Sequence, residues 1–170
     1  GWVSDHELLR RLVPSFVSMN PVTAICLVTG AASTMLAQLR WSRMACATSL
    51  LVTAIAAGKL VNIAFGVLPI DQFLFADRLE ADLGQLPNRM APNTAGALLL
   101  GGMAVMLLHS RWRHAKVLSQ LFGIWVCAMA SFALVGYGFD LHFFRKVGDF
   151  IPMALPTALG IFAWSVAILT

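Results

Sequence analysis

The chain has 170 residues, of which 59% are hydrophobic and 12% are charged, and its formal net charge is +4. Soluble domains have roughly 45–50% apolar and about 25% charged residues, so this composition excludes an ordinary soluble domain and indicates an integral membrane protein. The positive charges are distributed as topology signals and form no soluble basic face, which excludes binding of a nucleic-acid backbone.

Five apolar stretches are long enough to be transmembrane helices, which take about 20 residues to cross a hydrocarbon core of about 30 Å. We therefore expect an all-α integral membrane protein with about five transmembrane helices and a single domain, residues 1–170. The expected helices, in chain order, are 21–38, 45–68, 92–109, 117–138 and 153–170.

A motif recurs with a period of 71 residues. The sequence MNPVTA at 19–24 returns as MAPNTA at 90–95, and Gly30 then matches Gly101. A third copy, MALPTA, stands at 153–158. Such periodicity predicts repeated helical hairpins. The expected units are a first hairpin at 8–78, a second at 79–150 and a half repeat at 151–170.

The motif has the properties of a helix start. Proline suits the first helical turn, where its missing N–H has no intrahelical partner, and Asn20 is a candidate N-cap. The motif threonines can bond a carbonyl one turn earlier. If the three starts converge, their partial positive charge would favour an anionic or carbonyl-bearing ligand. The alternative is duplication of a stable hairpin without a site. The residues of the expected ring are Met19, Thr23, Met90, Asn93, Thr94, Met153 and Thr157.

Two further groups complete the candidate ligand site. Lys59 is a charged residue deep in an expected span, with Asn62 three residues later on the same face, and intramembrane charges are functional candidates by default. The alternative for Lys59 is a side chain that reaches toward the interface. We expect 73–75 or 142–144, which includes His142, to cover a pocket that Gly30 and Gly101 close from below.

Other chemistry is poorly supported. No catalytic motif and no carboxylate pair within one span is present, so we expect no enzymatic activity. Cys26, Cys46 and Cys127 lack the spacing of a disulfide framework or a zinc site. No histidine lies centrally in a span, where a bis-histidine haem would need two. The sequence identifies no cofactor and no metal site.

Charge placement predicts the orientation. The connections 40–43 and 111–116 contain five Lys or Arg and no acid, and short basic loops stay in the cytoplasm. With five spans, the C-terminus is then cytoplasmic and the chain begins outside. We therefore expect a piece of a longer protein with one more preceding helix.

Small residues indicate close helix packing. Ala97 and Gly101 lie four apart on one face, and such faces let helices approach closely in lipid. This packing serves either contacts within the monomer or a homodimer.

The segments LVPSFVSMNPVTAICLVTGAAS, LPNRMAPNTAGALLLGGMAVMLL and GDFIPMALPTALGIF resemble the N-terminal membrane regions of some bacterial histidine kinases and diguanylate cyclases. The resemblance implies a membrane-embedded sensory or anchoring module. We expect this module to be a multi-pass protein of the bacterial inner membrane, with a small hydrophobic ligand at the helix starts near the outer face. Its last helix would lead into cytoplasmic signalling domains, none of which is present. The alternative is a small integral subunit that binds quinone, lipid or pigment in an energy-converting complex.

Overall fold

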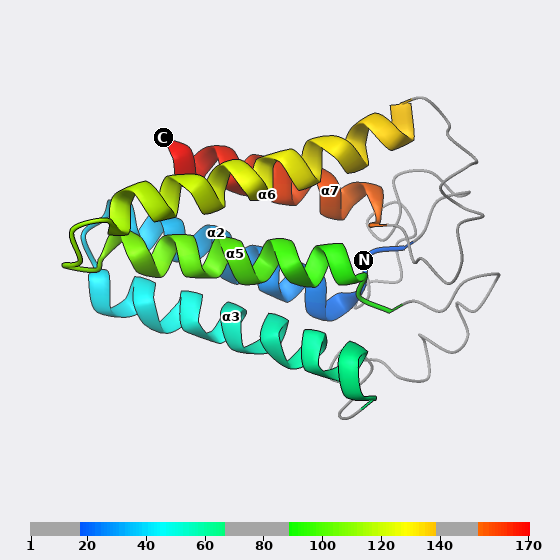
Figure 1. Ribbon diagram of the computed structural model, residues 1–170, viewed down its shortest axis with the longest axis horizontal. Helices are drawn as coiled ribbons and strands as arrows, with labels where there is room; N and C mark the ends of the chain where they lie inside the picture. The colour runs from blue at the N-terminus through cyan, green and yellow to red at the C-terminus, as the bar shows by residue number, and fades with distance from the viewer. Residues whose placement is uncertain (1–17, 67–88, 139–152) are drawn as a thin grey trace.

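The computed structural model describes residues 18–66, 89–138 and 153–170, and these form five helices and no strand (Figure 1). The predicted all-α fold is therefore confirmed, and each expected helix is present within a few residues of its predicted ends. The helices are α2 (Pro21–Gln38), α3 (Ser42–Phe65), α5 (Pro92–Leu108), α6 (Ala115–Gly138) and α7 (Leu155–Leu169).

Three of the helices, α2, α3 and α6, are long and apolar enough to cross a membrane. The apolar helices α5 and α7 are shorter, with 17 and 15 residues, or about 25 Å and 22 Å at a rise of about 1.5 Å per residue. The membrane character expected from composition is thus supported. The number of five spans and the repeat boundaries stay predictions.

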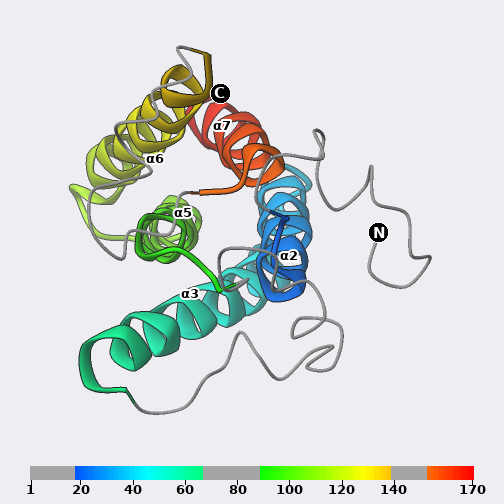
Figure 2. The same cartoon turned by 90° about the vertical axis from the view of Figure 1, so that its right-hand side faces the viewer.

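Helix α5 lies at the centre of the bundle (Figure 2) and packs against α2, α3, α6 and α7. Helices α2, α5 and α7 also contact one another in all three pairs. Their N-terminal ends lie at the same end of the bundle, and α3 and α6 run back in the opposite direction (Figure 1). The repeated motif therefore begins three parallel helices that meet in the core.

Small and hydroxylated residues allow α5 to have neighbours on several sides. A Cβ added at Gly102 would lie 3.1 Å from the carbonyl oxygen of Ser49, so the backbones of α3 and α5 approach closely there. On another side, the Ser119 hydroxyl of α6 donates a buried hydrogen bond of 2.8 Å to the Ala104 carbonyl. Close backbone contact of this kind is how helices associate in lipid.

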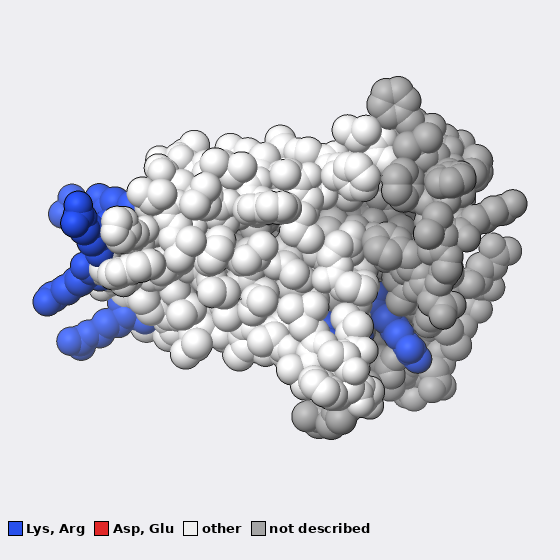
Figure 3. Space-filling model, in the orientation of Figure 1, with Lys and Arg blue, Asp and Glu red and all other residues white. Residues whose placement is uncertain are grey.

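The basic residues of the two short turns gather at one end of the bundle, while the middle of the face in Figure 3 shows almost no charge. The expectation that both turns lie on the same side is borne out by their position, but the side of the membrane stays a prediction. The exposed basic residues at this end are Arg40, Arg43, Arg111, Arg113 and Lys116.

Candidate functional site

The start of α2 is held by its own side chains. Asn20 has an extended backbone, and its Oδ1 accepts the N–H of Val22 at 2.9 Å, with Pro21 in the first turn. This is the N-cap that the sequence predicts, and it fixes where the helix begins. In α5, Asn93 lies inside the first turn and its Oδ1 accepts the N–H of Thr94 at 3.0 Å.

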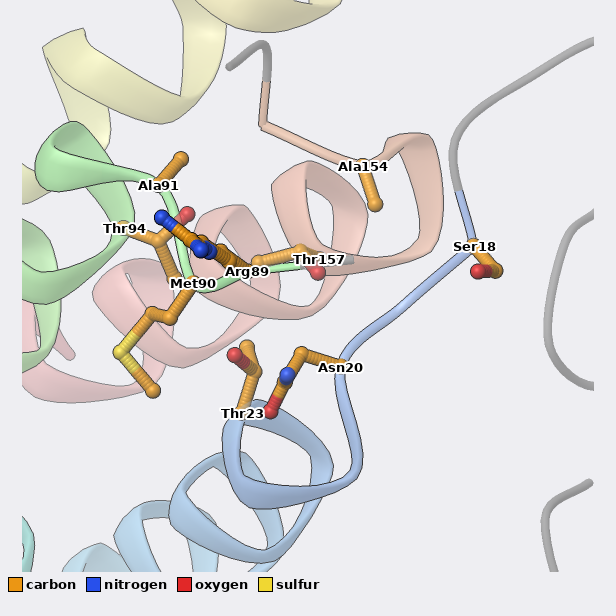
Figure 4. Close-up of a pocket in the computed structure, with 9 residues that line it drawn as sticks. All are labelled: Ser18, Asn20, Thr23, Arg89, Met90, Ala91, Thr94, Ala154 and Thr157. Carbon is orange, nitrogen blue, oxygen red and sulfur yellow. The ribbon is translucent and has the colours of Figure 1, made fainter. Parts of the chain in front are cut away.

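The three helix starts converge on one pocket. Thr23 of α2, Thr94 of α5 and Thr157 of α7 all line it (Figure 4). We call this the threonine pocket. Its cavity volume is about 10 Å³, which is room for about one water molecule. The other lining residues are Ser18, Asn20, Arg89, Met90, Ala91 and Ala154.

The three threonines are buried, each with only 2% of its surface exposed. Among residues 18–66, 89–138 and 153–170, no group forms a hydrogen bond with any of their three hydroxyls. The expected bonds to carbonyls one turn earlier are therefore not formed. Buried polar groups in proteins normally have a partner, so three such hydroxyls around one cavity indicate that the cavity accommodates a polar group.

The electrostatic environment of the pocket is positive. Three helix N-termini point toward it, each carrying about half of an elementary charge, and the exposed Arg89 stands at its edge. None of the nine residues that line the pocket is acidic. The arrangement therefore suits the negative end of a ligand.

Below the threonines, the same three helices supply an apolar layer. Four residues after each threonine come Leu27, Leu98 and Ile161, which are all buried. These side chains belong to the hydrophobic core. Because of them, a polar group in the pocket has apolar side chains beneath it.

Seven residues after each threonine, the repeat becomes asymmetric: two copies have Gly30 and Gly101, and the third has Trp164. A Cβ added at Gly30 would lie 2.7 Å from Cζ2 of Trp164, and one added at Gly101 would lie 2.6 Å from Cζ3. The indole Nε1 donates a buried hydrogen bond of 2.9 Å to the Thr34 hydroxyl. We call the space beside Gly30 and Gly101 the glycine notch, and the ring of Trp164 fills it.

We expected the small-residue packing of Gly30 and Gly101 to close the pocket from below, and the structure shows which side chain these glycines pack against. The atoms that a Cβ at either position would meet first belong to the indole of Trp164. The two glycines have no side chains to fill the space between α2, α5 and α7, and the indole ring of Trp164 fills it instead. The core between these helices therefore depends on a side chain that only the third copy of the motif supplies.

The remaining residues of the expected ring differ in burial and in whether they line the pocket. Met90 is buried and lines the pocket, whereas Met153 is buried without lining it. Met19 and Asn93 are half-buried. His142, and the segments 73–75 and 142–144 that we expected to cover the pocket, lie outside the described residues. The cover of the pocket therefore stays a prediction.

Lys59 and Asn62 form a separate pair on α3. The Lys59 side chain is buried, with 4% of its surface exposed, and its Nζ donates to Asn62 Oδ1 at 3.4 Å. The predicted proximity of these two residues on one helix face is present. Neither residue lines the threonine pocket, so the structure does not unite all the expected ligand residues in one site.

Sequence reasoning missed Arg89, Ser18 and Trp164 as parts of this region. Arg89 immediately precedes the second copy of the motif, and Trp164 stands at the repeat position of the two glycines, so extending the repeat register would have found it. The three cysteines are free. Within the part of the chain that the structure describes, no three His, Cys, Asp or Glu side chains gather as metal ligands.

Comparisons with protein-family models, with curated proteins and with solved structures gave no match for this chain.

Proposed function

We propose that this chain is a membrane-embedded sensory module in which a ligand in the threonine pocket changes the packing of α7. The observation that carries the proposal is the convergence of Thr23, Thr94 and Thr157, from three helices, on one polar cavity. Duplicated scaffolding alone gives no reason for three buried hydroxyls to share a space without bonding to any of the described residues. The resemblance to bacterial sensor regions points the same way.

Helix α7 is the element suited to transmit the signal. It contributes Thr157 to the pocket and Trp164 to the glycine notch, and these residues are about 10 Å apart along the helix axis. A ligand that draws Thr157 to a new position therefore also displaces the ring from its fitted place. Packed cores of this kind change between discrete arrangements rather than continuously.

The size of the response depends on how differently the ligand binds the two arrangements. A ligand shifts a two-state equilibrium only by its differential affinity, and a difference of about 1.4 kcal/mol changes the ratio tenfold. One charge-assisted hydrogen bond, worth roughly 1.5–3 kcal/mol, supplies that amount if it forms in only one arrangement.

The proposed orientation places the threonine pocket at the outer face of a bacterial inner membrane. It follows from the basic turns at the opposite end, because Lys and Arg in short loops favour the cytoplasm. The end of α7 lies at the basic end in Figure 1, so a movement of α7 would be available to a cytoplasmic partner.

The proposal is tested on the purified chain in an uncharged detergent, with ¹⁵N-labelled tryptophan. The chain has five tryptophans, and Trp164→Phe identifies the indole N–H signal of Trp164. Sodium acetate, acetamide, glycerol and methylammonium chloride serve as an anion, a carbonyl, a polyol and a cation. A sensor predicts that a compound which raises the unfolding midpoint also shifts the Trp164 signal.

The matched control is Trp125, which is exposed on α6 and whose signal should stay in place. A compound that stabilises the chain while leaving the Trp164 signal unchanged would contradict the sensor. That result would instead favour the alternative, a small integral subunit that binds its ligand without transmitting a movement.

A further inference from the structure

We infer that the threonine pocket binds a carboxylate group, as the head of the ligand that the proposed sensor detects. The inference rests on the proposed function for the choice of site, but it concerns only which chemical group enters the cavity. Binding can be measured whether or not α7 responds.

Thr23, Thr94 and Thr157 each have a hydroxyl that can donate one hydrogen bond and accept others. All three are buried, and no group in the described ranges is bonded to them. A carboxylate accepts bonds at about four positions on two oxygens, so one such group can accept bonds from more than one of these hydroxyls.

Hydroxyls alone would suit hydrogen-bond donors and acceptors equally, so the charge around the pocket decides which kind of group it favours. The converging N-termini of α2, α5 and α7 each add about half of an elementary positive charge. Arg89 adds a guanidinium, which is permanently charged and matches carboxylate geometry. With no acidic residue in the lining, the pocket repels a cation and attracts an anion.

The pocket is small. The cavity of about 10 Å³ has room for about one water-sized group, and Leu27, Leu98 and Ile161 lie beneath it. A flat carboxylate can insert one oxygen among the hydroxyls and leave the other beside the exposed Arg89. A tetrahedral phosphate has more oxygens than a carboxylate, and more of them would have to stay outside this cavity.

A carboxylate can reach the pocket from two sources, as a free small acid or as the head of a membrane-borne fatty acid. Both present the same group to the threonines. They differ in the tail, which must leave the pocket through its mouth. Acetate and octanoate therefore serve as the two probes.

The experiment measures the unfolding midpoint of the full chain in uncharged detergent, at constant pH and ionic strength. Sodium acetate or sodium octanoate is titrated against sodium chloride, and acetamide is the uncharged equivalent of acetate. We expect a saturable rise with one or both carboxylates, at least tenfold tighter than with acetamide. A rise of the midpoint with acetate alone identifies the ligand as a free small acid. A rise with octanoate alone identifies it as a membrane-borne acid.

Hydroxyl variants connect the binding to the pocket. Thr94→Val keeps the side-chain shape and removes the hydroxyl, so carboxylate affinity should fall at least tenfold, while Thr94→Ser should retain it. Thr48→Val is the matched control, because the Thr48 hydroxyl bonds the Met44 carbonyl on α3 outside the pocket. Without ligand, Thr94→Val should not lower the unfolding midpoint, since no hydrogen bond within the described residues is lost.

Several results would overturn the inference. The unfolding midpoint could fail to rise with either carboxylate, or could rise equally with chloride or acetamide. It could rise with phosphate alone, or the carboxylate affinity could be unchanged in Thr94→Val. A carboxylate that binds without shifting the Trp164 indole signal contradicts only the sensor. A different compound that shifts this signal contradicts only the carboxylate.

Discussion

Replacing Gly101 with alanine would add a methyl group to a space that Trp164 already fills. The new Cβ would lie 2.6 Å from Cζ3 and 2.7 Å from Cη2 of the ring, well inside the separation of about 3.5–4.0 Å at which carbon atoms attract best. The indole is rigid and its Nε1 is bonded to Thr34. It cannot move by the required distance without weakening that bond.

The magnitude follows from two opposing terms. Overpacking a core costs about 1–3 kcal/mol. We expect a cost near the upper value for Gly101→Ala, because the rigid Trp164 ring cannot move away from the new methyl group. Alanine favours the helical backbone over glycine by about 1 kcal/mol. We therefore expect Gly101→Ala to lower the free energy of unfolding by about 2 kcal/mol.

Gly96→Ala is the matched control on the same helix. Among the described residues, its Cβ would meet only the flexible Met129 Cε, at an ordinary contact distance of 3.7 Å. The higher helix propensity of alanine then acts without an opposing clash, so the variant should be about 1 kcal/mol more stable. The assay is unfolding by sodium dodecyl sulfate in mixed micelles, followed by circular dichroism. Equal stability of Gly96→Ala and Gly101→Ala would refute the described fit of the indole.

A double variant isolates the contact. Trp164→Phe removes the ring atoms that the new methyl group would meet, so its effect should not add to that of Gly101→Ala. Residues in contact show such coupling, commonly of about 0.5–3 kcal/mol. Strict additivity of the two changes would mean that the loss in Gly101→Ala arises elsewhere.

Three further outcomes are expected. Thr34→Val should cost about 1–3 kcal/mol in the same titration, because it leaves the buried indole N–H of Trp164 without its acceptor; an unchanged midpoint would contradict this. Asn20→Ala should cost about 1 kcal/mol through loss of the N-cap, whereas Asn20→Ser should restore most of it. In a chain without native cysteines, Ser42→Cys and Ser110→Cys should react with an impermeant thiol reagent only from the cytoplasmic side. Labelling of either from outside would reverse the proposed orientation.

Local sequence signals predict some of the helix ends and not others. The start of α2 was predictable because Asn20 and Pro21 have a defined role there. The start of α3 was placed too late, at residue 45, because Arg43 was assigned to a polar turn. The helix begins at Ser42, since a basic side chain can extend toward water while its backbone is helical. At the other end, Gly66 has a φ of 70°, a common glycine stop.

The site was predictable in its polar part and not in its core. Repetition placed Thr23, Thr94 and Thr157 at equal depth, and three parallel helices then brought them together. Nothing in the motif gives the size of the cavity, because that depends on how side chains of different helices fill the space. The role of Trp164 was missed for the same reason, since a ring that occupies the space of two glycines is a property of the assembled bundle.

The asymmetry of the third repeat has a consequence for the order of assembly. The glycine notch requires Gly30 of α2 and Gly101 of α5 to be neighbours already, so the binding surface for Trp164 does not exist until α2 and α5 have associated. Before that step the indole N–H lacks the hydroxyl of Thr34 as its acceptor. Helix α7 follows α2 and α5 in the sequence and is therefore synthesised after both of them. Its docking through Trp164 requires α2 and α5 to be in place, so a chain in which these two helices are misplaced has no fitted site for the ring.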